Sequence, residues 1–522
     1  MKFIRKIASR IISIKSARGI SFALAVISLA SKPLGYARTL IVAWAFGTSP
    51  GMDAYHLASG IMTLFTAGVG STLENAALPE LVKTRGKEGG ARASEVLTAF
   101  LACFTCAVAA LFAAAVLIAP GVIVKSFAGG FDAERIRVGA RMMLWLIPFA
   151  VVSMLRPILG LWANLTERYT LSSLSSTPFN LIAIPALLLS VPFIGVYGVA
   201  FSMSAGYVIL FILFLAALRG IPLRWRVRDV AWVVVAKICK NSFYLVILFT
   251  ANTIYIVVDR YFASRLPFGS VAAISYAATV IGTLAAFADT PMAYFLSMVA
   301  KLSGDRERSL ETLKKAISLA LAYFVPTSVF MMAAAEPVVS LVFGGGNFDA
   351  RSVAMTSLCV AAYSAGFAFG SASVFIYRYA LAVGKLKTVV KLTFVLIALN
   401  AVLDWAFVRR WGLLGLTLAT SLTQTAGFVL YYSAVAGAGL PRFLFESGLI
   451  RQAALSASLA YAAWRASVFG AGVQLAACAA LYAAYFAAAQ KTGLMPRVPE
   501  NWRPAGLMAF LWSGAKSYAG KK

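Results

Sequence analysis

The sequence predicts an all-α polytopic membrane protein with about fourteen transmembrane helices, arranged as two six-helix lobes in a parallel pseudo-repeat plus two C-terminal helices. Three observations carry this prediction. The 522 residues are 61% hydrophobic and only 13% charged, with a mean hydropathy of +0.83, whereas a soluble domain of this size would expose far more charge. Apolar runs of membrane-spanning length recur along the chain, and a short motif appears twice at the same helix rank.

The apolar runs set the number of predicted helices. Each holds about 20 residues or more, the length that an α-helix needs to cross the hydrocarbon core of a bilayer. The runs lie at 20–46, 53–82, 94–118, 138–162, 171–193, 196–218, 239–263, 270–299, 312–335, 352–379, 388–408, 412–436, 447–467 and 469–489.

An internal repeat sets the predicted domain organisation. Residues 120–133 read PGVIVKSFAGGFDA and residues 337–350 read PVVSLVFGGGNFDA, and each copy follows the third helix of a six-helix set. An even number of helices per copy keeps both copies in the same orientation, as in two-lobed alternating-access carriers. We therefore predict an N-lobe at 20–218, a cytoplasmic linker at 219–238, a C-lobe at 239–436 and two further helices at 437–490.

Basic residues outnumber acidic ones, with 47 Lys and Arg against 19 Asp and Glu and a net charge of +28. They concentrate in alternate connections between the apolar runs, which is the positive-inside signal rather than a nucleic-acid-binding surface. We expect a multi-pass protein of the bacterial inner membrane with both termini cytoplasmic and no nucleic-acid partner. Residues 1–19 are predicted to form a basic interfacial helix, and residues 491–522 a basic cytoplasmic tail.

The sequence offers no constellation for enzymatic chemistry. His56 is the single histidine, the five cysteines lie mostly in apolar runs, and no GxxxxGKS/T nucleotide loop occurs. We predict a transporter rather than an enzyme, without catalytic residues, bound metal or cofactor. Its energy would come from the membrane potential or from an H⁺ or Na⁺ gradient.

The most informative charges are Lys32 and Arg38, because both lie within the first predicted span. A cation at membrane depth costs at least about 2.5–3.5 kcal/mol, so a purely structural helix would avoid it. A proline and a glycine between the two cations indicate a broken helix whose charges face a polar cavity. The pair predicts contact with an anionic substrate; the alternative is an internal ion pair with Glu74 or Asp53.

Other charges in or near the spans complete the predicted site. With Lys32 and Arg38, two more residues are assigned to substrate binding, Asp53 and Arg156. Four residues are assigned to ion coupling or gating, namely Glu74, Arg260, Asp289 and Arg378.

Several of these charges also have a structural interpretation. Arg156 precedes a proline and could bond carbonyls that a helix kink leaves free. Asp259, Arg260 and Arg378 could lie at a membrane interface. Asp289 could hold a proton or sodium ion, or pair with a cation of the first helix, and Asp404 could cap the end of a helix.

Several stretches resemble one known family. SKPLGYARTLIVAWAFG followed by MDAY resembles the opening signature of the MurJ/MviN branch of the multidrug/oligosaccharidyl-lipid/polysaccharide exporter superfamily. VFGGGNF, AAYSAGFAFG and YRYALAVGKLKTVVK resemble its ninth-to-eleventh-helix region. The resemblance covers about residues 20–490 and implies two six-helix lobes plus two helices. Members flip lipid II, the undecaprenyl-pyrophosphate-linked peptidoglycan precursor, from the cytoplasmic to the outer leaflet.

The resemblance also implies roles for individual residues. Lys32 and Arg38 occupy the first and second basic positions of the family motif, and Asp53 occupies its acidic position. Further charged positions of the family carry uncharged residues in this chain, near Phe65, Thr66, Thr279 and Gly282.

We therefore hypothesise a flippase that moves a polyprenyl-pyrophosphate-linked saccharide of the lipid II type across the inner membrane by alternating access. The expected partners are that lipid-linked glycan, the lipid bilayer and glycan-synthesis enzymes. Three alternatives stay open: a Wzx-like flippase for exopolysaccharide or O-antigen lipids, an ion-coupled MATE-like small-molecule antiporter, and a non-transporting scaffold for glycan-synthesis enzymes.

Overall fold

The structure, a computed structural model, describes residues 33–72, 77–85, 90–165, 176–217, 232–286, 305–437 and 448–491, together with residues 295, 299 and 444. Within these ranges the regular secondary structure is helical, apart from one isolated bridge between Gly345 and Phe348. The predicted interfacial helix at 1–19 lies outside the described residues, as do most of the predicted linker and nearly all of the predicted tail.

Every predicted span contains a described helix, which confirms the all-α prediction. The first is residues 33–46. The others of the first half are α3 (Pro50–Thr72), α4 (Leu78–Arg85), α5 (Gly90–Ile118), α6 (Pro120–Phe127), α7 (Ala133–Leu165), α9 (Ser176–Ile194), α10 (Tyr197–Ala217) and α11 (Trp232–Ala263). The second half holds α12 (Ser270–Ala285), α14 (Arg306–Ala333), α15 (Ala335–Phe343), α16 (Ala350–Ala382), α17 (Leu386–Ala436), α19 (Leu449–Arg465) and α20 (Ala471–Lys491).

Helix α17 accounts for two predicted spans. Its backbone leaves the helical region at Gly412, where φ is 55° and ψ is −128°, so that two helices meet there. A side chain rarely adopts a positive φ, and glycine does so without steric cost. Among the described residues, seven helices are long and apolar enough to cross a membrane, and α12 and residues 178–194 of α9 are shorter apolar helices. The protein is a multi-pass membrane protein.

Packing divides the chain into two compact units. Unit 1 contains the described residues of Met1–Val42 and Ala54–Val257, and unit 2 those of Ala43–Asp53 and Val258–Arg503. The segment Ala43–Asp53 therefore packs with unit 2, although the helices on either side of it continue into unit 1.

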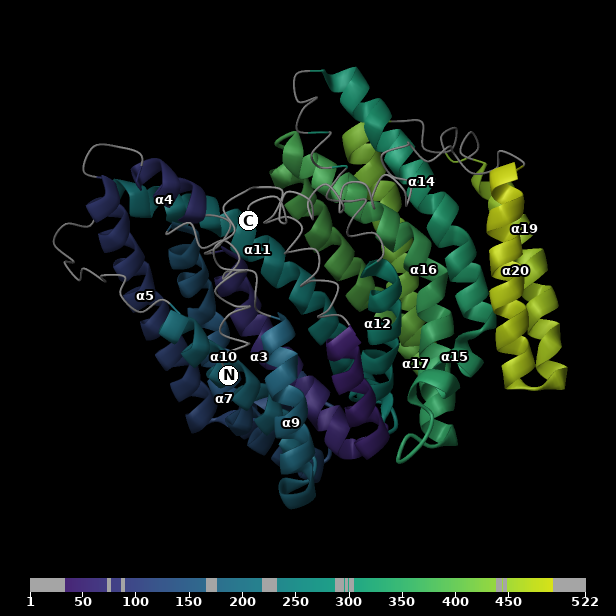
Figure 1. Ribbon diagram of the computed structural model, residues 1–522, viewed down its shortest axis with the longest axis horizontal. Coiled ribbons are helices and arrows are strands. Elements are labelled where there is room, and N and C mark those ends of the chain that lie inside the picture. The colour runs from purple at the N-terminus through teal and green to yellow at the C-terminus, as the bar shows by residue number, and fades with distance from the viewer. Residues whose placement is uncertain are drawn as a thin grey trace, which may run out of the picture. The chain divides into compact units, whose positions relative to one another are not determined.

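Unit 1 is built around α7 and α10. Helix α10 packs against α9 and α7, and α5 covers another side of α7 (Figure 1). The contact between α9 and α10 is close because Gly206 has no side chain: a Cβ there would lie 2.9 Å from the ring of Phe179. Apolar side chains of α7 and α10, including Leu159 and Phe214, form a buried cluster at their contact.

Unit 2 is built around α16, which packs against α17, α14 and α12 (Figure 1). A Cβ on Gly366 would lie 2.5 Å from the Cα atom of Ser421, so this glycine permits the close approach of α16 to α17. Helices α19 and α20 pack on each other and on α14. Their contact buries Tyr485 and Ala463.

The two copies of the repeated motif have the same local structure. In each, a short helix (α6 or α15) leads into a loop, and a long helix (α7 or α16) follows. Asp132 Oδ1 accepts a hydrogen bond of 2.8 Å from Arg135 N, and Asp349 Oδ1 accepts one of 2.8 Å from Ser352 N. Each aspartate thus caps the long helix of its copy. Ser352 extends this link, because its hydroxyl lies 2.8 Å from that of Thr48.

Candidate functional site

Two of the predicted substrate-binding residues, Arg38 and Arg156, interact electrostatically with the same tyrosine in unit 1. Arg38, on helix 33–46, holds its guanidinium 5.4 Å from the ring centroid of Phe179 on α9. The ring of Phe179 is in turn 4.7 Å from that of Tyr207 on α10. Tyr207 interacts electrostatically with both Arg38 and Arg156, the latter on α7. We call Arg38, Arg156, Phe179 and Tyr207 the cation cluster.

The cation cluster retains capacity to bind an anion. Arg38 is half-buried, and its Nε is buried without a hydrogen-bond partner in the described part of the chain. A guanidinium carries five N–H donors in a planar fork that matches phosphate or carboxylate oxygens. The aromatic faces of Phe179 and Tyr207 favour a nearby cation but accept no strong hydrogen bond, so they leave its donors available.

Asp53 has a different environment. Its side chain is 1% exposed, and its two oxygens accept backbone hydrogen bonds from Gly269 N at 2.6 Å and Ala272 N at 2.8 Å. These donors belong to the N-terminus of α12, where a negative charge is favourable. The carboxylate thus caps α12 from another part of unit 2. We assign it a structural role; its predicted contact with substrate stays untested.

Three further contacts in unit 2 fix the backbone of residues 44–47, two of them at or beside the glycine loop 344–346. Asn347 N donates to Trp44 O at 2.8 Å, and the hydroxyl of Tyr276 donates to Gly47 O at 3.2 Å. A Cβ on Gly346 would lie 2.4 Å from Trp44 O. The segment that joins the first two described helices is therefore fixed to unit 2 through its backbone.

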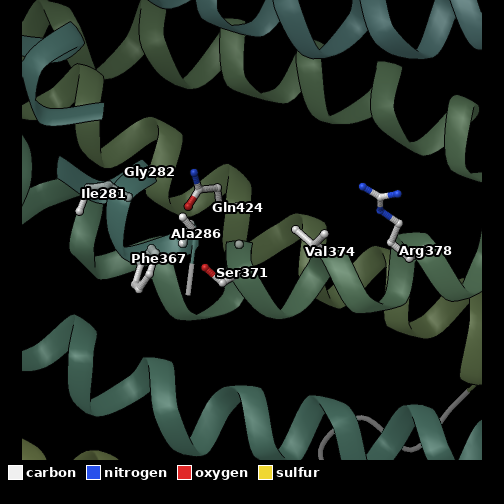
Figure 2. Close-up of a pocket in the computed structure, with 10 residues that line it drawn as sticks. Ile281, Gly282, Ala286, Phe367, Ser371, Val374, Arg378 and Gln424 are labelled. Atoms are coloured by element: carbon white, nitrogen blue, oxygen red, sulfur yellow. The ribbon is translucent and has the colours of Figure 1, made fainter. Parts of the chain in front are cut away.

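Arg378 lines a cavity of about 480 Å³ in unit 2. Figure 2 shows its guanidinium at one end of the cavity, with the amide of Gln424 and the hydroxyl of Ser371 further along α16 and α17. No described residue forms an ion pair or hydrogen bond with Arg378. The remaining lining residues shown with it are mostly small or apolar: Ile281, Gly282, Ala286, Phe367 and Val374.

A buried polar network occupies another part of unit 2. The amide of Asn400 donates to Asp259 Oδ1 at 2.8 Å and to Asp404 Oδ2 at 2.8 Å. The hydroxyl of Thr420 donates to Asp259 Oδ2 at 3.1 Å, and that of Thr423 donates to Asn400 Oδ1 at 3.2 Å. Asp404 is 0% exposed, and its Oδ1 has no hydrogen-bond partner among the described residues.

The sequence alone does not predict this network. From the sequence, Asp404 is interpreted as a helix cap and Asp259 as a residue at a membrane interface. The available signal was the spacing of Asn400 and Asp404, which places both on one face of a helix, together with an acidic residue in the seventh span. Arg260 lies within electrostatic range of Asp259. Among the described residues, no group of three or more His, Cys, Asp or Glu side chains could hold a metal ion.

Three predicted site residues lie outside the described residues: Lys32, Glu74 and Asp289. Their assignments stay predictions. Of the others, Arg38 and Arg156 share the cation cluster, and Arg378 and Arg260 lie in unit 2.

Comparison with protein families gives one match that covers most of the chain. The family model described as lipid II flippase MurJ matches residues 42–469. A probable lipid II flippase MurJ from Synechocystis sp. is 24% identical over 489 residues, which cover 87% of this chain and 89% of the relative. A probable lipid II flippase MurJ from Thermotoga maritima is 26% identical over 403 residues, which cover 76% of this chain and 81% of the relative.

Solved structures show the same fold. A lipid II flippase MurJ in an inward closed conformation superposes with a TM-score of 0.76 at 18% identity, covering 90% of this chain and 99% of that one. An inward-facing MATE-family multidrug resistance transporter of the MOP superfamily superposes with a TM-score of 0.63 at 14% identity, covering 84% of this chain and 99% of that one.

Proposed function

The chain belongs to the lipid II flippase MurJ family, and on that premise we propose that it moves a polyprenyl-pyrophosphate-linked saccharide of the lipid II type across the bacterial inner membrane. It moves the lipid without changing it chemically, by alternating access of its two units. The observation that carries this proposal is the cation cluster, in which Arg38 and Arg156 both interact electrostatically with Tyr207 on apolar helices.

The chemistry of the cation cluster suits a pyrophosphate. A pyrophosphate brings several anionic oxygens to membrane depth, where each needs a donor or a cation. A guanidinium offers paired N–H donors to two oxygens of one phosphate group, and two guanidiniums offset more of its charge. Lys32, which precedes Arg38 by six positions in the sequence, would add a point charge. The polyprenyl tail needs no such contact and stays in the hydrocarbon.

The buried network around Asn400 supports the choice of an ion gradient as energy source. Asp259 and Asp404 are both buried and accept hydrogen bonds from the same amide, that of Asn400. Of two carboxylates this close in a buried site, one takes up a proton unless a cation offsets their charge. We propose that an H⁺ or a Na⁺ binds between these carboxylates and couples the gradient to transport.

Orientation and partners complete the proposal. The positive-inside pattern supports cytoplasmic termini. A lipid II-type substrate is made by membrane-associated glycan-synthesis enzymes, which are the expected protein partners.

Complementation tests the function and the role of Arg38 together. The chain is produced in a bacterial strain depleted of its own lipid II flippase, as wild type and as Arg38→Glu and Arg409→Glu variants. Arg409 is the matched control, because its guanidinium also stacks on an aromatic ring, 4.2 Å from Trp405. We expect growth with wild type and with Arg409→Glu, and none with Arg38→Glu at equal membrane abundance. Growth with Arg38→Glu would exclude the cation cluster as the pyrophosphate site.

A further inference from the structure

A second cavity of unit 2, of about 320 Å³, lies where α3, α12 and α16 begin. All of its lining residues belong to unit 2, and neither the cation cluster nor the buried network around Asn400 includes any of them. Its volume lies at the lower end of the range of small-molecule sites, roughly 300–1,000 Å³. The cavity therefore suits a small ligand group that the proposed transport site does not account for.

The cavity is lined by one cation and one anion that do not pair with each other. Arg351 holds its guanidinium 3.8 Å from the ring centroid of Phe268, and its Nη2 donates to Phe268 O at 3.0 Å. Asp349 instead caps α16, accepting a hydrogen bond of 2.8 Å from Ser352 N. Both charged residues are exposed, and neither forms an ion pair with a residue that the structure describes. Each charge is thus held in place by its own contacts and remains available to a ligand.

The first copy of the repeated motif shows that capping a helix does not require this separation of charges. In that copy, Arg135 Nε lies 3.4 Å from Oδ2 of the capping residue Asp132, so the aspartate has its own counter-ion. The position that corresponds to Arg351 carries a glutamate there, Glu134. The separate cation and anion are therefore a property of the second copy and of its cavity.

Neutral polar groups of the cavity add a donor and an acceptor. The hydroxyl of Ser49 lines the cavity and forms no hydrogen bond with a described residue. The amide of Asn347 donates to Ala45 O at 2.6 Å, which leaves its Oδ1 as an acceptor. A phosphate group accepts from the paired N–H donors of a guanidinium, and a primary ammonium donates to carboxylate and amide oxygens. The lining therefore suits a zwitterion that carries a phosphate and a primary ammonium.

The aromatic residues around the cavity indicate that this zwitterion belongs to a lipid. Phe268 lines the cavity and is 44% exposed. Trp44, whose carbonyl accepts a hydrogen bond of 2.8 Å from Asn347 N, is 63% exposed. Tryptophan is enriched where membrane-spanning helices meet the polar headgroups. The phosphate and ammonium groups of phospholipids lie at the same level of the bilayer.

We propose that this cavity, the zwitterion pocket, binds the phosphoethanolamine headgroup of a bilayer phospholipid, with Arg351 and Ser49 donating to the phosphate and Asp349 and Asn347 accepting from the ammonium. The ligand is a lipid of the surrounding membrane and not the transported one, so the inference does not rest on the proposed function. Because residues 45–50 and 347–352 both contribute to the walls, the bound headgroup bridges these two segments of unit 2.

Binding of three phospholipids with identical acyl chains to the purified protein tests the pocket, with native mass spectrometry as the measurement. Phosphatidylethanolamine carries both groups, phosphatidylcholine has a quaternary ammonium without N–H donors, and phosphatidylglycerol has no cation. We expect wild type to bind phosphatidylethanolamine about tenfold more tightly than the other two, the contribution of one good charge-assisted hydrogen bond.

Two variants remove the charges of the pocket. Arg351→Gln removes the guanidinium, and Asp349→Asn removes the carboxylate charge while asparagine still caps α16. Each should bind phosphatidylethanolamine about tenfold more weakly than wild type. The matched controls are Arg265→Gln and Asp132→Asn, which should bind it as wild type does. Arg265 is also exposed beside an aromatic ring and Asp132 also caps a helix, but neither lines the cavity.

Ser49→Ala keeps the test decisive if a charge variant does not fold. The Ser49 hydroxyl has no hydrogen bond to a described residue that the substitution could break. Its loss should weaken binding of phosphatidylethanolamine about threefold, as expected for one hydrogen bond to the phosphate.

Three outcomes overturn the proposal. Equal affinity of wild type for the three phospholipids shows that the pocket does not recognise the ammonium. A preference for phosphatidylethanolamine that both Arg351→Gln and Ser49→Ala retain in full places the lipid elsewhere. Glycerophosphoethanolamine, which has the headgroup without acyl chains, should bind far more weakly than the lipid. Binding of this soluble probe as tight as that of the lipid, and dependent on Arg351, would show that the ligand is not a lipid.

Discussion

Asp53 offers the sharpest test of how the structure is held together. Its carboxylate joins α3 to the N-terminus of α12 through two short hydrogen bonds, of 2.6 Å to Gly269 N and 2.8 Å to Ala272 N. Asp53→Asn keeps the shape of the side chain. It removes the charge and turns an amide N–H₂ toward a backbone N–H, so at least one buried donor loses its partner.

The expected loss follows from these contacts. Hydrogen bonds to a charged group contribute about 1.5–3 kcal/mol each, and a buried unpaired donor costs about 1–3 kcal/mol. Taking the low end for two bonds gives about 3 kcal/mol for Asp53→Asn. For a unit of roughly 150–250 residues, 1 kcal/mol shifts the midpoint of unfolding by about 2–4 °C, so we expect a fall of about 6–12 °C.

Thermal unfolding of the purified protein in detergent measures this fall. Asp132→Asn is the matched control, because Asp132 caps α7 from an exposed position with one hydrogen bond of 2.8 Å to Arg135 N. Asparagine caps a helix about as well as aspartate, so this exposed change costs only the interaction of the charge with the helix dipole, about 0.3–1 kcal/mol, hence a fall of at most about 4 °C. If Asp53→Asn unfolds at the same temperature as wild type, the capping role is refuted, and the predicted contact of Asp53 with substrate becomes the better interpretation.

Further predictions concern the close contacts and the buried charges. Gly366→Ala should lower the unfolding temperature by several degrees, because its Cβ would meet Ser421 Cα at 2.5 Å, and an unchanged midpoint would contradict that contact. Asp404→Asn should remove the dependence of lipid transport on the H⁺ or Na⁺ gradient, measured in proteoliposomes with each gradient in turn; undiminished coupling would exclude this carboxylate as the ion site. The Ser352 hydrogen bonds hold the pKa of Asp349 below its usual 3.8, so Asp349 stabilises the fold above that pH. The Asp349→Asn variant should therefore have a lower unfolding temperature than wild type at neutral pH. This difference in unfolding temperature should shrink as the pH falls below 3.8, and a difference independent of pH would exclude the charge as its cause.

The helices could be predicted because the membrane imposes one physical requirement on each. A span has to be apolar for about 20 residues, and that requirement is visible in the sequence alone. The junction at Gly412 coincides with the start of the predicted span 412–436, because the sequence RRWG interrupts the apolar pattern there. Of the predicted span 270–299, α12 covers Ser270–Ala285, and most of the remaining residues lie outside the described part of the chain.

The sites were less predictable, because their partners are distant in sequence. Arg38 is recognisable as a cation in an apolar run, but nothing in the sequence connects it with Phe179 or Tyr207. In the sequence these two aromatic residues resemble the many others of the apolar spans. Asp53 similarly resembles an acidic site residue, and its capping of α12 depends on contacts across more than two hundred positions.

The uncharged positions of the family motif have local explanations. Thr279 donates its hydroxyl to Ser275 O at 3.0 Å, within its own helix. Phe65 packs against Phe112, with ring centroids 5.3 Å apart. At both positions the uncharged side chain therefore has a partner close by in the structure. The described cations that share a cluster within the spans of unit 1 are Arg38 and Arg156.

Transport of lipid II in proteoliposomes tests the central claim most directly. Purified protein is reconstituted with fluorescent lipid II under a membrane potential and an ion gradient, and the fraction of lipid accessible from one side is followed in time. We predict rapid exchange of lipid II between leaflets with wild type and with Arg409→Glu, and exchange at the rate of protein-free vesicles with Arg38→Glu. Wild-type protein that moves no lipid II, or Arg38→Glu protein that moves it at the wild-type rate, would contradict the account.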